Sequence, residues 1–299
     1  MTLQLISQLM DANIEIAAFV DTTPAGSLFR AVFHLPRALL APEYLKRGWH
    51  LVRKLKKSGI KMYSVASNLE IVGDQKATGL SFTSRGSRYD IEADVIALHE
   101  GVIPNTQTGR LLNIEHQWDN SQNAFRPVLD GYGETSVAGV FAAGDNAGIL
   151  GAKSAVLSGE ITGCAIVEKL GFIKESARDL IIEEAKLRRF IENGVRPMLE
   201  ALYPAPDWIS STENETIIRR CEEVLAGDLR KIVADGCAGP NQAKAFLRCG
   251  MGTCQGRMCA STVTEIIAKE LKRPANICLL YTSDAADERS SVDLGGRRI

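Results

Sequence analysis

Cysteines crowd one short stretch in the last third of the chain. Five of the seven lie between residues 221 and 259, interleaved with glycines: Cys221, Cys237, Cys249, Cys254 and Cys259. The N-terminus has neither the basic start nor the apolar core of a secretory signal, so disulfides are not the expected use of these thiols. Thiolates on a glycine-rich loop are typical of iron–sulfur or zinc sites. The pattern therefore predicts a small metal-binding fold, with scattered buried cysteines as the alternative.

The motifs in this stretch resemble a known family. Cys221-Glu-Glu-Val, Ala226-Gly-Asp-Leu and Cys249-Gly-Met-Gly-Thr-Cys254-Gln-Gly-Arg-Met-Cys259 are similar to the bacterioferritin-associated-ferredoxin-like 2Fe–2S domain, over residues 216 to 271. More narrowly, they resemble the copy of that domain in flavoprotein subunits of the opine oxidase, hydrogen cyanide synthase and D-hydroxyproline dehydrogenase type. The resemblance implies cluster ligands at Cys221, Cys254 and Cys259.

The fourth ligand of that family pattern is replaced. Arg219 stands where the resemblance implies a further cysteine, and a guanidinium has no lone pair to give to iron. Three outcomes are open: Cys249 or Cys237 substitutes, the cluster is labile, or the cluster is absent. Cys249 is the better substitute because it precedes Cys254 on the same glycine-rich loop. The alternative metal centre is a zinc site formed by Cys221, Cys249, Cys254 and Cys259.

A second motif occupies residues 135–145, Thr-Ser-Val-Ala-Gly-Val-Phe-Ala-Ala-Gly-Asp. Its apolar run at 140–143 predicts a buried parallel strand, with Gly144 at the turn and Asp145 at the carboxyl end. The helix expected to follow, up to Leu170, has an N-terminus suited to a bound anion. The stretch resembles the Thr-x5-Phe-Ala-x-Gly-Asp motif of two-dinucleotide-binding-domain flavoproteins, which implies that Gly144 and Asp145 bind FAD. A plain strand–Gly–Asp–helix turn is the alternative.

The first hundred residues predict part of a nucleotide-binding domain. A helix through Asp11 and a strand ending at Val20 precede Asp21, which takes the place of a ribose-binding acid at a strand tip. An ordinary turn residue is the alternative for Asp21. The glycine-rich loop that should come earlier is not in the sequence, so we expect an N-terminally truncated chain. Its absence argues against NAD(P) binding, because that loop holds the pyrophosphate.

Together these motifs predict an α/β fold: a partial two-dinucleotide-binding-domain (Rossmann-like) flavoprotein with a small, mainly helical iron–sulfur domain. Periodicity and end signals predict helices at 42–58, 226–234 and 260–271. The expected divisions are a partial nucleotide-binding domain at 1–100, the C-terminal part of the FAD-binding domain at 101–171, a helical linker at 172–212, the iron–sulfur domain at 213–276 and a tail at 277–299. The tail resembles translated sequencing-adapter read-through, and we expect it to be non-native and disordered.

Composition excludes some classes of partner. A net charge of −1 argues against nucleic acid, and no apolar run reaches the length of a membrane span. We expect a cytoplasmic protein, with peripheral attachment to the inner membrane only through partners.

The family resemblance implies an electron-transferring FAD and 2Fe–2S subunit of a multi-subunit dehydrogenase of the amine, opine or amino-acid class, acting on C–N bonds. Its expected partners are an FAD-dependent oxidase-like companion subunit, together with a small ferredoxin-like subunit. No catalytic residue of its own is assigned. The alternative is a non-catalytic iron–sulfur or zinc interaction module on a remnant Rossmann scaffold. A dithiol reductase of the flavin-linked kind is not favoured, because only Cys164 and Cys278 lie outside the cysteine-rich domain.

Overall fold

The computed structural model describes residues 2–275, so Cys278 and the tail predicted at 277–299 lie outside the described residues. Contacts within the chain define two units. Unit 1 comprises the described residues up to Gly101 together with Arg188–Pro206, and unit 2 comprises Val102–Leu187 with the described residues from Asp207 onward. The helical linker predicted at 172–212 is thus shared between the two units. The fold of both is mixed α/β, as the sequence predicts.

Unit 1 combines helices with two small sheets. Strands β1 and β2 pair in parallel, with Asp21 opposite Ser64, while β3, β4 and β5 form an antiparallel sheet in that order. In chain order its elements are α1 (Thr2–Asp11), β1 (Ala18–Asp21), α2 (Ser27–Val32), α3 (Leu35–Ala38), α4 (Pro42–Lys57), β2 (Lys61–Ser64), β3 (Ala66–Val72), β4 (Gly79–Ser84), β5 (Ser87–Glu92), η2 (Asn193–Val195) and α8 (Arg196–Leu202).

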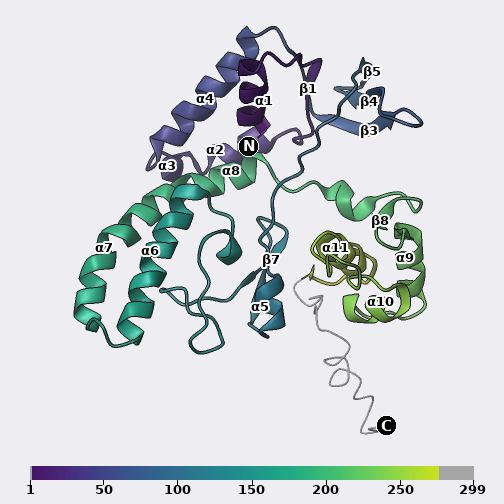
Figure 1. The fold of residues 1–299 in the computed structure, drawn as a ribbon. Coiled ribbons are helices and arrows are strands. Elements are labelled where there is room, and N and C mark those ends of the chain that lie inside the picture. Colours follow the sequence, from purple (N-terminus) through teal and green to yellow (C-terminus); the bar gives the residue numbers. More distant parts are fainter. Residues whose placement is uncertain (1, 276–299) are drawn as a thin grey trace, which may run out of the picture. The chain divides into compact units, whose positions relative to one another are not determined.

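Helix α4 follows the signals in its sequence. Pro42 opens it, where a missing N–H costs nothing, and basic side chains fill its last turn, where they complement the helix dipole. Helices α1 and α4 lie side by side (Figure 1), and Lys54 joins them. Its ammonium donates to Ser7 Oγ and to Asp11 Oδ1, both at 2.7 Å.

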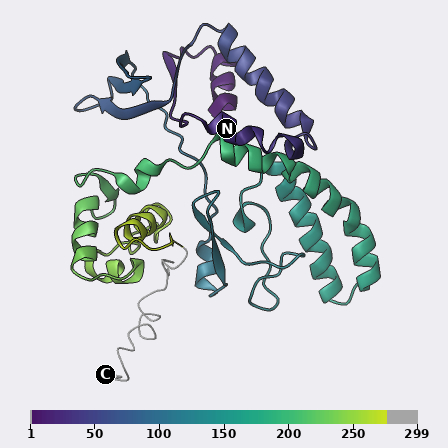
Figure 2. The same ribbon diagram turned by 180° about the vertical axis from the view of Figure 1, so that it is seen from behind.

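The first half of unit 2 contains a hairpin and a helix pair. Buried Leu157 and Ile161 of α6 pack against Ile182 and Ala185 of α7, and both views show the two helices side by side (Figure 1 and Figure 2). The elements are α5 (Gln107–Leu111), β6 (His116–Asp119), β7 (Ala124–Pro127), the 3-10 helix η1 (Gly144–Ala147), α6 (Ala152–Lys169) and α7 (Glu175–Glu192). β6 and β7 are antiparallel.

The parallel strand predicted at 140–143 is wrong. Within residues 2–275, the bridge that this run makes is an isolated antiparallel one between Phe141 and Glu134. A strand needs a neighbour whose backbone groups complete its ladder. The run meets the preceding turn instead: Ala142 N–H donates to Gly133 O and Thr135 N–H to Val140 O, both at 2.9 Å.

The second half of unit 2 is a small helical domain with one short hairpin. Its core is lined by apolar side chains and cysteines, and Val263, Ile266 and Ile267 are fully buried. Each such side chain contributes about 1.5–3 kcal/mol by leaving water. The elements are η3 (Asp207–Ser211), β8 (Ile217–Arg219), β9 (Val224–Leu225), α9 (Ala226–Ala234), α10 (Pro240–Leu247) and α11 (Ala260–Glu270). No helix of the described chain is both long and apolar enough to cross a membrane.

Candidate functional site

Gly144 and Asp145 form the start of η1, which is joined to α6 by the short segment 148–151. Gly144 has a φ of +67°, a left-handed value that glycine adopts without strain. Its N–H donates to Ser158 Oγ at 2.8 Å, and that hydroxyl donates to Ala155 O at 2.8 Å. The turn is therefore tied to the first half of α6 rather than to a sheet.

The region around Asp145 suits an anionic ligand such as the phosphate part of FAD. Asp145 itself is exposed, so its carboxylate can accept hydrogen bonds from ligand hydroxyls. Among the described residues no side chain caps the N-terminus of α6, and its first turn contains no acidic residue. The dipole of the helix favours a phosphate at this end. The residues present thus fit the flavin site predicted from the sequence.

Asp21 lies in unit 1, at the end of β1. Its Oδ1 accepts the N–H of Thr23 at 3.0 Å, which closes a local turn. Burial, and next the charge of Asp21, raise the pKa of Tyr203 in the same unit. The Asp21 carboxylate therefore stabilises the turn in which it lies. Its predicted role with ribose stays a prediction, and it belongs to a different unit from Asp145.

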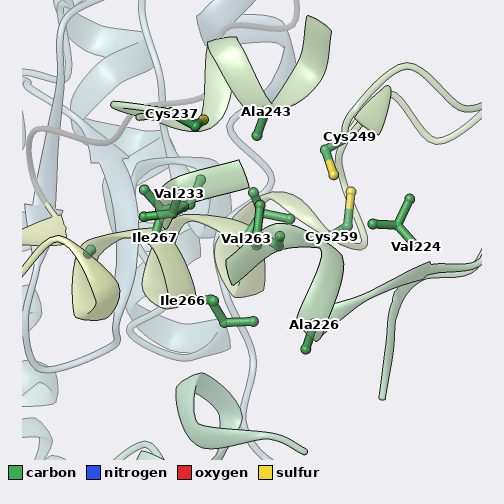
Figure 3. Packing of buried hydrophobic residues seen from close by; sticks show 12 residues of the cluster. Val224, Ala226, Val233, Cys237, Ala243, Cys249, Cys259, Val263, Ile266 and Ile267 are labelled. Carbon is green, nitrogen blue, oxygen red and sulfur yellow. The ribbon is translucent and has the colours of Figure 1, made fainter. Parts of the chain in front are cut away.

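The predicted metal ligands lie around one corner of the C-terminal core. We call Cys221, Cys249, Cys254 and Cys259 the thiol cluster. Cys249 and Cys259 are buried with their sulfurs facing one another (Figure 3), whereas Cys254 is half-buried and Cys221 is exposed. Cys237 is also buried, but it packs at the α9–α10 end of the core and donates to Gly239 O at 3.3 Å. The fold thus brings the four candidate ligands together and directs Cys237 elsewhere.

Arg219 enters this corner from β8. Its side chain is only 2 % exposed. Nη1 donates to Leu247 O at 3.1 Å, and Nη2 donates to Glu222 Oε1 at 3.3 Å. Its positive charge acts on Cys249 and Cys259 and favours their thiolates. Sequence reasoning identified Arg219 as a missing ligand, but it gave no sign that the guanidinium would be buried beside the thiols.

The thiols differ strongly in acidity. Burial, and next the neighbouring Cys259, raise the pKa of Cys249 to about 12. Cys259 directly precedes α11, whose N-terminal dipole favours a thiolate, yet burial outweighs that effect and raises its pKa. Cys254 behaves in the opposite way. Hydrogen bonds from backbone amides, that of Met258 first, lower its pKa, and Cys221 adds to the effect.

A four-thiolate cluster does not fit this arrangement. Within residues 2–275, no group of three or more His, Cys, Asp or Glu side chains is placed to hold a metal ion. The position of the first family ligand is filled by a guanidinium that already has two acceptors. Its proposed substitute, Cys249, is buried in the core beside Cys259. We therefore assign no electron-transfer step to a cluster in this chain.

A hollow of about 210 Å³ lies beside the cysteine loop within unit 2. Its walls include Trp118, Phe125, Arg110 and Arg257. The Arg110 guanidinium lies 5.6 Å from the centre of the Phe125 ring, and burial lowers the pKa of Arg110 to about 10. Sequence reasoning missed these residues. Pro104 and Asn105 also line the hollow.

The chain is similar to several known proteins. Residues 34–160 match the family described as pyridine nucleotide-disulphide oxidoreductase. An opine oxidase subunit of Agrobacterium tumefaciens (strain Ach5) is 38% identical over 91% of this chain and 54% of its own length. Hydrogen cyanide synthase subunit HcnB of Pseudomonas aeruginosa is 26% identical over 84% of this chain and 55% of its own length. The chain thus spans about half the length of the curated relatives it matches.

A solved structure supports the fold. The crystal structure of L-proline dehydrogenase from P. horikoshii superposes with a TM-score of 0.60, at 18% sequence identity, over 91% of this chain and 49% of that one. This likeness concerns the fold alone. By sequence, residues 34–160 are thus similar to the pyridine nucleotide-disulphide oxidoreductase family, and the chain is similar to subunits of opine oxidase and hydrogen cyanide synthase.

Proposed function

We propose that this chain is part of an electron-transferring flavoprotein subunit of a multi-subunit dehydrogenase of the amine, opine or amino-acid class. The relatives at 38% and 26% identity are named as subunits, which supports a role within an assembly. Their names refer to an opine oxidase and a hydrogen cyanide synthase, which supports oxidation at a C–N bond. We propose no substrate more specific than an amine, opine or amino acid.

One observation carries the proposal: an exposed Asp145 lies in η1, which packs against α6, and both Asp145 and the uncapped start of α6 are inside the segment that matches the oxidoreductase family. We infer that Asp145 accepts hydrogen bonds from the hydroxyl groups of FAD. The first-turn amides of α6 bind its phosphate, and Gly144 keeps the approach free of a side chain. FAD, when bound, supplies the redox chemistry, and the protein supplies its position and electrostatic surroundings.

The 2Fe–2S centre and the zinc alternative stay predictions. Arg219 fills the position of the cysteine that the 2Fe–2S resemblance implies, so the proposed electron path does not include a cluster. No observation on the described residues favours the alternative of a non-catalytic iron–sulfur or zinc module. A purified chain without visible iron–sulfur absorbance and without bound metal is the expected result.

The companion subunits are part of the proposal. We expect an FAD-dependent oxidase-like partner, and a further candidate is a small ferredoxin-like protein, because the relatives are named as subunits. Affinity purification from source cells, followed by mass spectrometry, tests this composition. The cytoplasmic location stays a prediction.

The test of the flavin site is a fluorescence titration of the full chain with FAD. We compare the native protein with Asp145→Asn and with Glu160→Gln, an exposed residue on the middle of α6 that loses one negative charge in the same way. Losing a charge-assisted hydrogen bond costs about 1.5–3 kcal/mol, so Asp145→Asn should weaken binding about 10- to 100-fold. Equal affinities for all three proteins, or no binding by the native chain, would overturn the proposal.

A further inference from the structure

The hollow of about 210 Å³ in unit 2 has no part in the proposed flavin site. Its walls come from the β6–β7 hairpin, from α5 with the segment that leads into it, and from the loop that leads into α11. An apolar cavity of about 150 Å³ is enough to hold one benzene molecule, whereas a drug-sized ligand needs about 300 Å³ or more. The hollow therefore has room for a single ring with a small substituent, and a dinucleotide such as FAD does not fit.

Two aromatic rings form one wall of the hollow. Trp118 of β6 and Phe125 of β7 are paired across the hairpin, and their ring centres lie 5.0 Å apart at an interplanar angle of 77°. Phe125 is buried, so the packing of the hairpin fixes this wall. Aromatic faces and edges favour a planar ring in offset-stacked or edge-to-face contact. The wall therefore favours a planar ring over a puckered one.

Two arginines give the hollow its charge. The guanidinium of Arg110 lies 5.6 Å from the centre of the Phe125 ring, and Arg257, on the loop before α11, lines the same space. Burial lowers the pKa of Arg110 to about 10, so this side chain is still cationic at neutral pH. Among the described residues that line the hollow, none is acidic. The hollow therefore favours an anion, and a guanidinium fork matches the two oxygens of a carboxylate.

The first turn of α11 adds to this positive potential. Ala260 and Ser261 line the hollow, and within the described chain that turn has no acidic residue and no side-chain cap. The positive end of the helix dipole favours an anion there. Buried Thr106 and Gln107 also line the hollow, and Gln107 Nε2 donates to Gln255 Oε1 at 3.4 Å. Charge, dipole and hydrogen-bonding groups thus meet around one small space.

We propose that this hollow binds a small planar carboxylate, whose ring packs against Trp118 and Phe125 and whose carboxylate pairs with Arg110 and Arg257. A neutral ring would leave the two arginines without a counter-charge from the ligand. Inorganic phosphate would meet the arginines but would leave the aromatic wall uncovered. The proposal does not depend on the flavin function, because Asp145 and the start of α6 do not line the hollow.

The fluorescence of Trp118 reports whether the hollow is occupied. The chain has three tryptophans, and the other two, Trp49 and Trp208, are exposed. Trp49→Phe and Trp208→Phe together leave Trp118 as the single source of the signal. We titrate the full chain with these two substitutions, using benzoate as the probe. Contact between the two rings should change the emission saturably, with a Kd of about 1 mM or tighter, as expected for a ligand of this size.

Three comparison ligands separate the features of the probe. Benzamide keeps the planar ring without the charge, so it should bind about 10-fold more weakly than benzoate. Cyclohexanecarboxylate keeps the charge on a puckered ring, so it should bind about fivefold more weakly. Inorganic phosphate should displace benzoate only at concentrations about 10-fold higher than its competitor, since it makes no contact with the aromatic wall.

Matched variants in the same background make the result specific. Arg257→Met removes an exposed charge on the loop and should weaken benzoate binding about 10-fold. Arg248→Met is its control, because this arginine loses the same charge on a side chain that is 65% exposed and does not line the hollow. Arg110→Lys keeps the charge but not the planar fork, so it should also weaken binding.

Four outcomes would overturn the proposal. The first is no saturable change at about 10 mM benzoate in a chain whose circular dichroism shows that it is folded. The second is equal affinity for benzoate and benzamide, and the third is phosphate binding as tight as benzoate binding, which would indicate a simple anion site. The fourth is an equal effect of Arg257→Met and Arg248→Met. The FAD titration uses other residues, so either proposal can fail while the other holds.

Discussion

Substituting Arg219 by lysine and by methionine separates the shape of its guanidinium from its charge. Lysine keeps the charge but not the planar fork, so it cannot reach Leu247 O and Glu222 Oε1 together. The residue is 2 % exposed, so a charge that loses one partner there stays poorly solvated. Breaking a buried pair in this way costs about 3 kcal/mol.

Methionine fills a similar volume and removes the charge. The lost bond from Arg219 to Leu247 O contributes about 1.5–3 kcal/mol, and the half-exposed contact with Glu222 adds about 0–1 kcal/mol. The desolvation cost of a buried ion, which is several kcal/mol, disappears at the same time. We therefore expect Arg219→Met to lie within about 1 kcal/mol of the native stability.

Hydrogen exchange with mass spectrometry on peptides from α9 and α11 measures the difference, because both helices pack in the core behind the thiol cluster. Helices α9 and α11 should open about 30-fold more often in the Arg219→Lys variant than in the Arg219→Met variant, which corresponds to a difference of about 2 kcal/mol in opening free energy. Arg248→Met is the control. That arginine also approaches Glu222, at 3.6 Å, but its side chain is 65% exposed, so its loss should change little.

The opposite order would refute this reasoning. If the helices opened far more often in Arg219→Met than in Arg219→Lys, the domain would require the positive charge itself, to balance negative charge on the neighbouring cysteines. If both variants lost stability equally and by a large amount, the pairing geometry of Arg219 would dominate, and its desolvation would cost little.

Three further predictions concern the same domain. Burial, and next Asp207, raise the pKa of Glu265 from 4.5 to about 7, so the stabilisation by its protonated form is complete below pH 4.5 and is lost as pH rises through 7. The opening free energy of α11 should fall over that range, and Glu265→Gln should remove the dependence. Iodoacetamide at neutral pH should modify Cys254 before Cys249, because amide donors lower the first pKa and burial raises the second; peptide mapping measures the order. A chelator should leave the unfolding midpoint of the domain unchanged, and a loss of helical signal would contradict this.

The helices were the most predictable part of the fold. Residues 42–58, 226–234 and 260–271 were predicted as helices, and the structure has them at Pro42–Lys57, Ala226–Ala234 and Ala260–Glu270. Helix ends depend on local signals, such as Pro42 at a first position and basic residues in a last turn. These signals act over a few residues, so they can be read without the rest of the molecule.

The run at 140–143 shows why strands were less predictable. Its apolar residues suit a buried strand. An apolar run indicates that the segment is buried, but it does not identify the neighbouring strand with which it would pair. Thr135 and Gly133 of the preceding turn are the partners that the structure provides. The candidate flavin residues Gly144 and Asp145 nevertheless keep their predicted place before α6, because the glycine turn and the helix are local features.

The sequence by itself determined the α/β class, the cysteine-rich C-terminal domain and the Gly–Asp turn before a helix, since these follow from spacing and composition along the chain. Only the tertiary structure decided how the cysteines divide. Packing of α9 and α11 buries Cys249 and Cys259, leaves Cys221 beside Cys254, and encloses Arg219 between a carbonyl and a carboxylate. The physical reason is that burial and paired hydrogen bonds depend on neighbours distant in sequence, and these neighbours set which thiols ionise and which groups can meet.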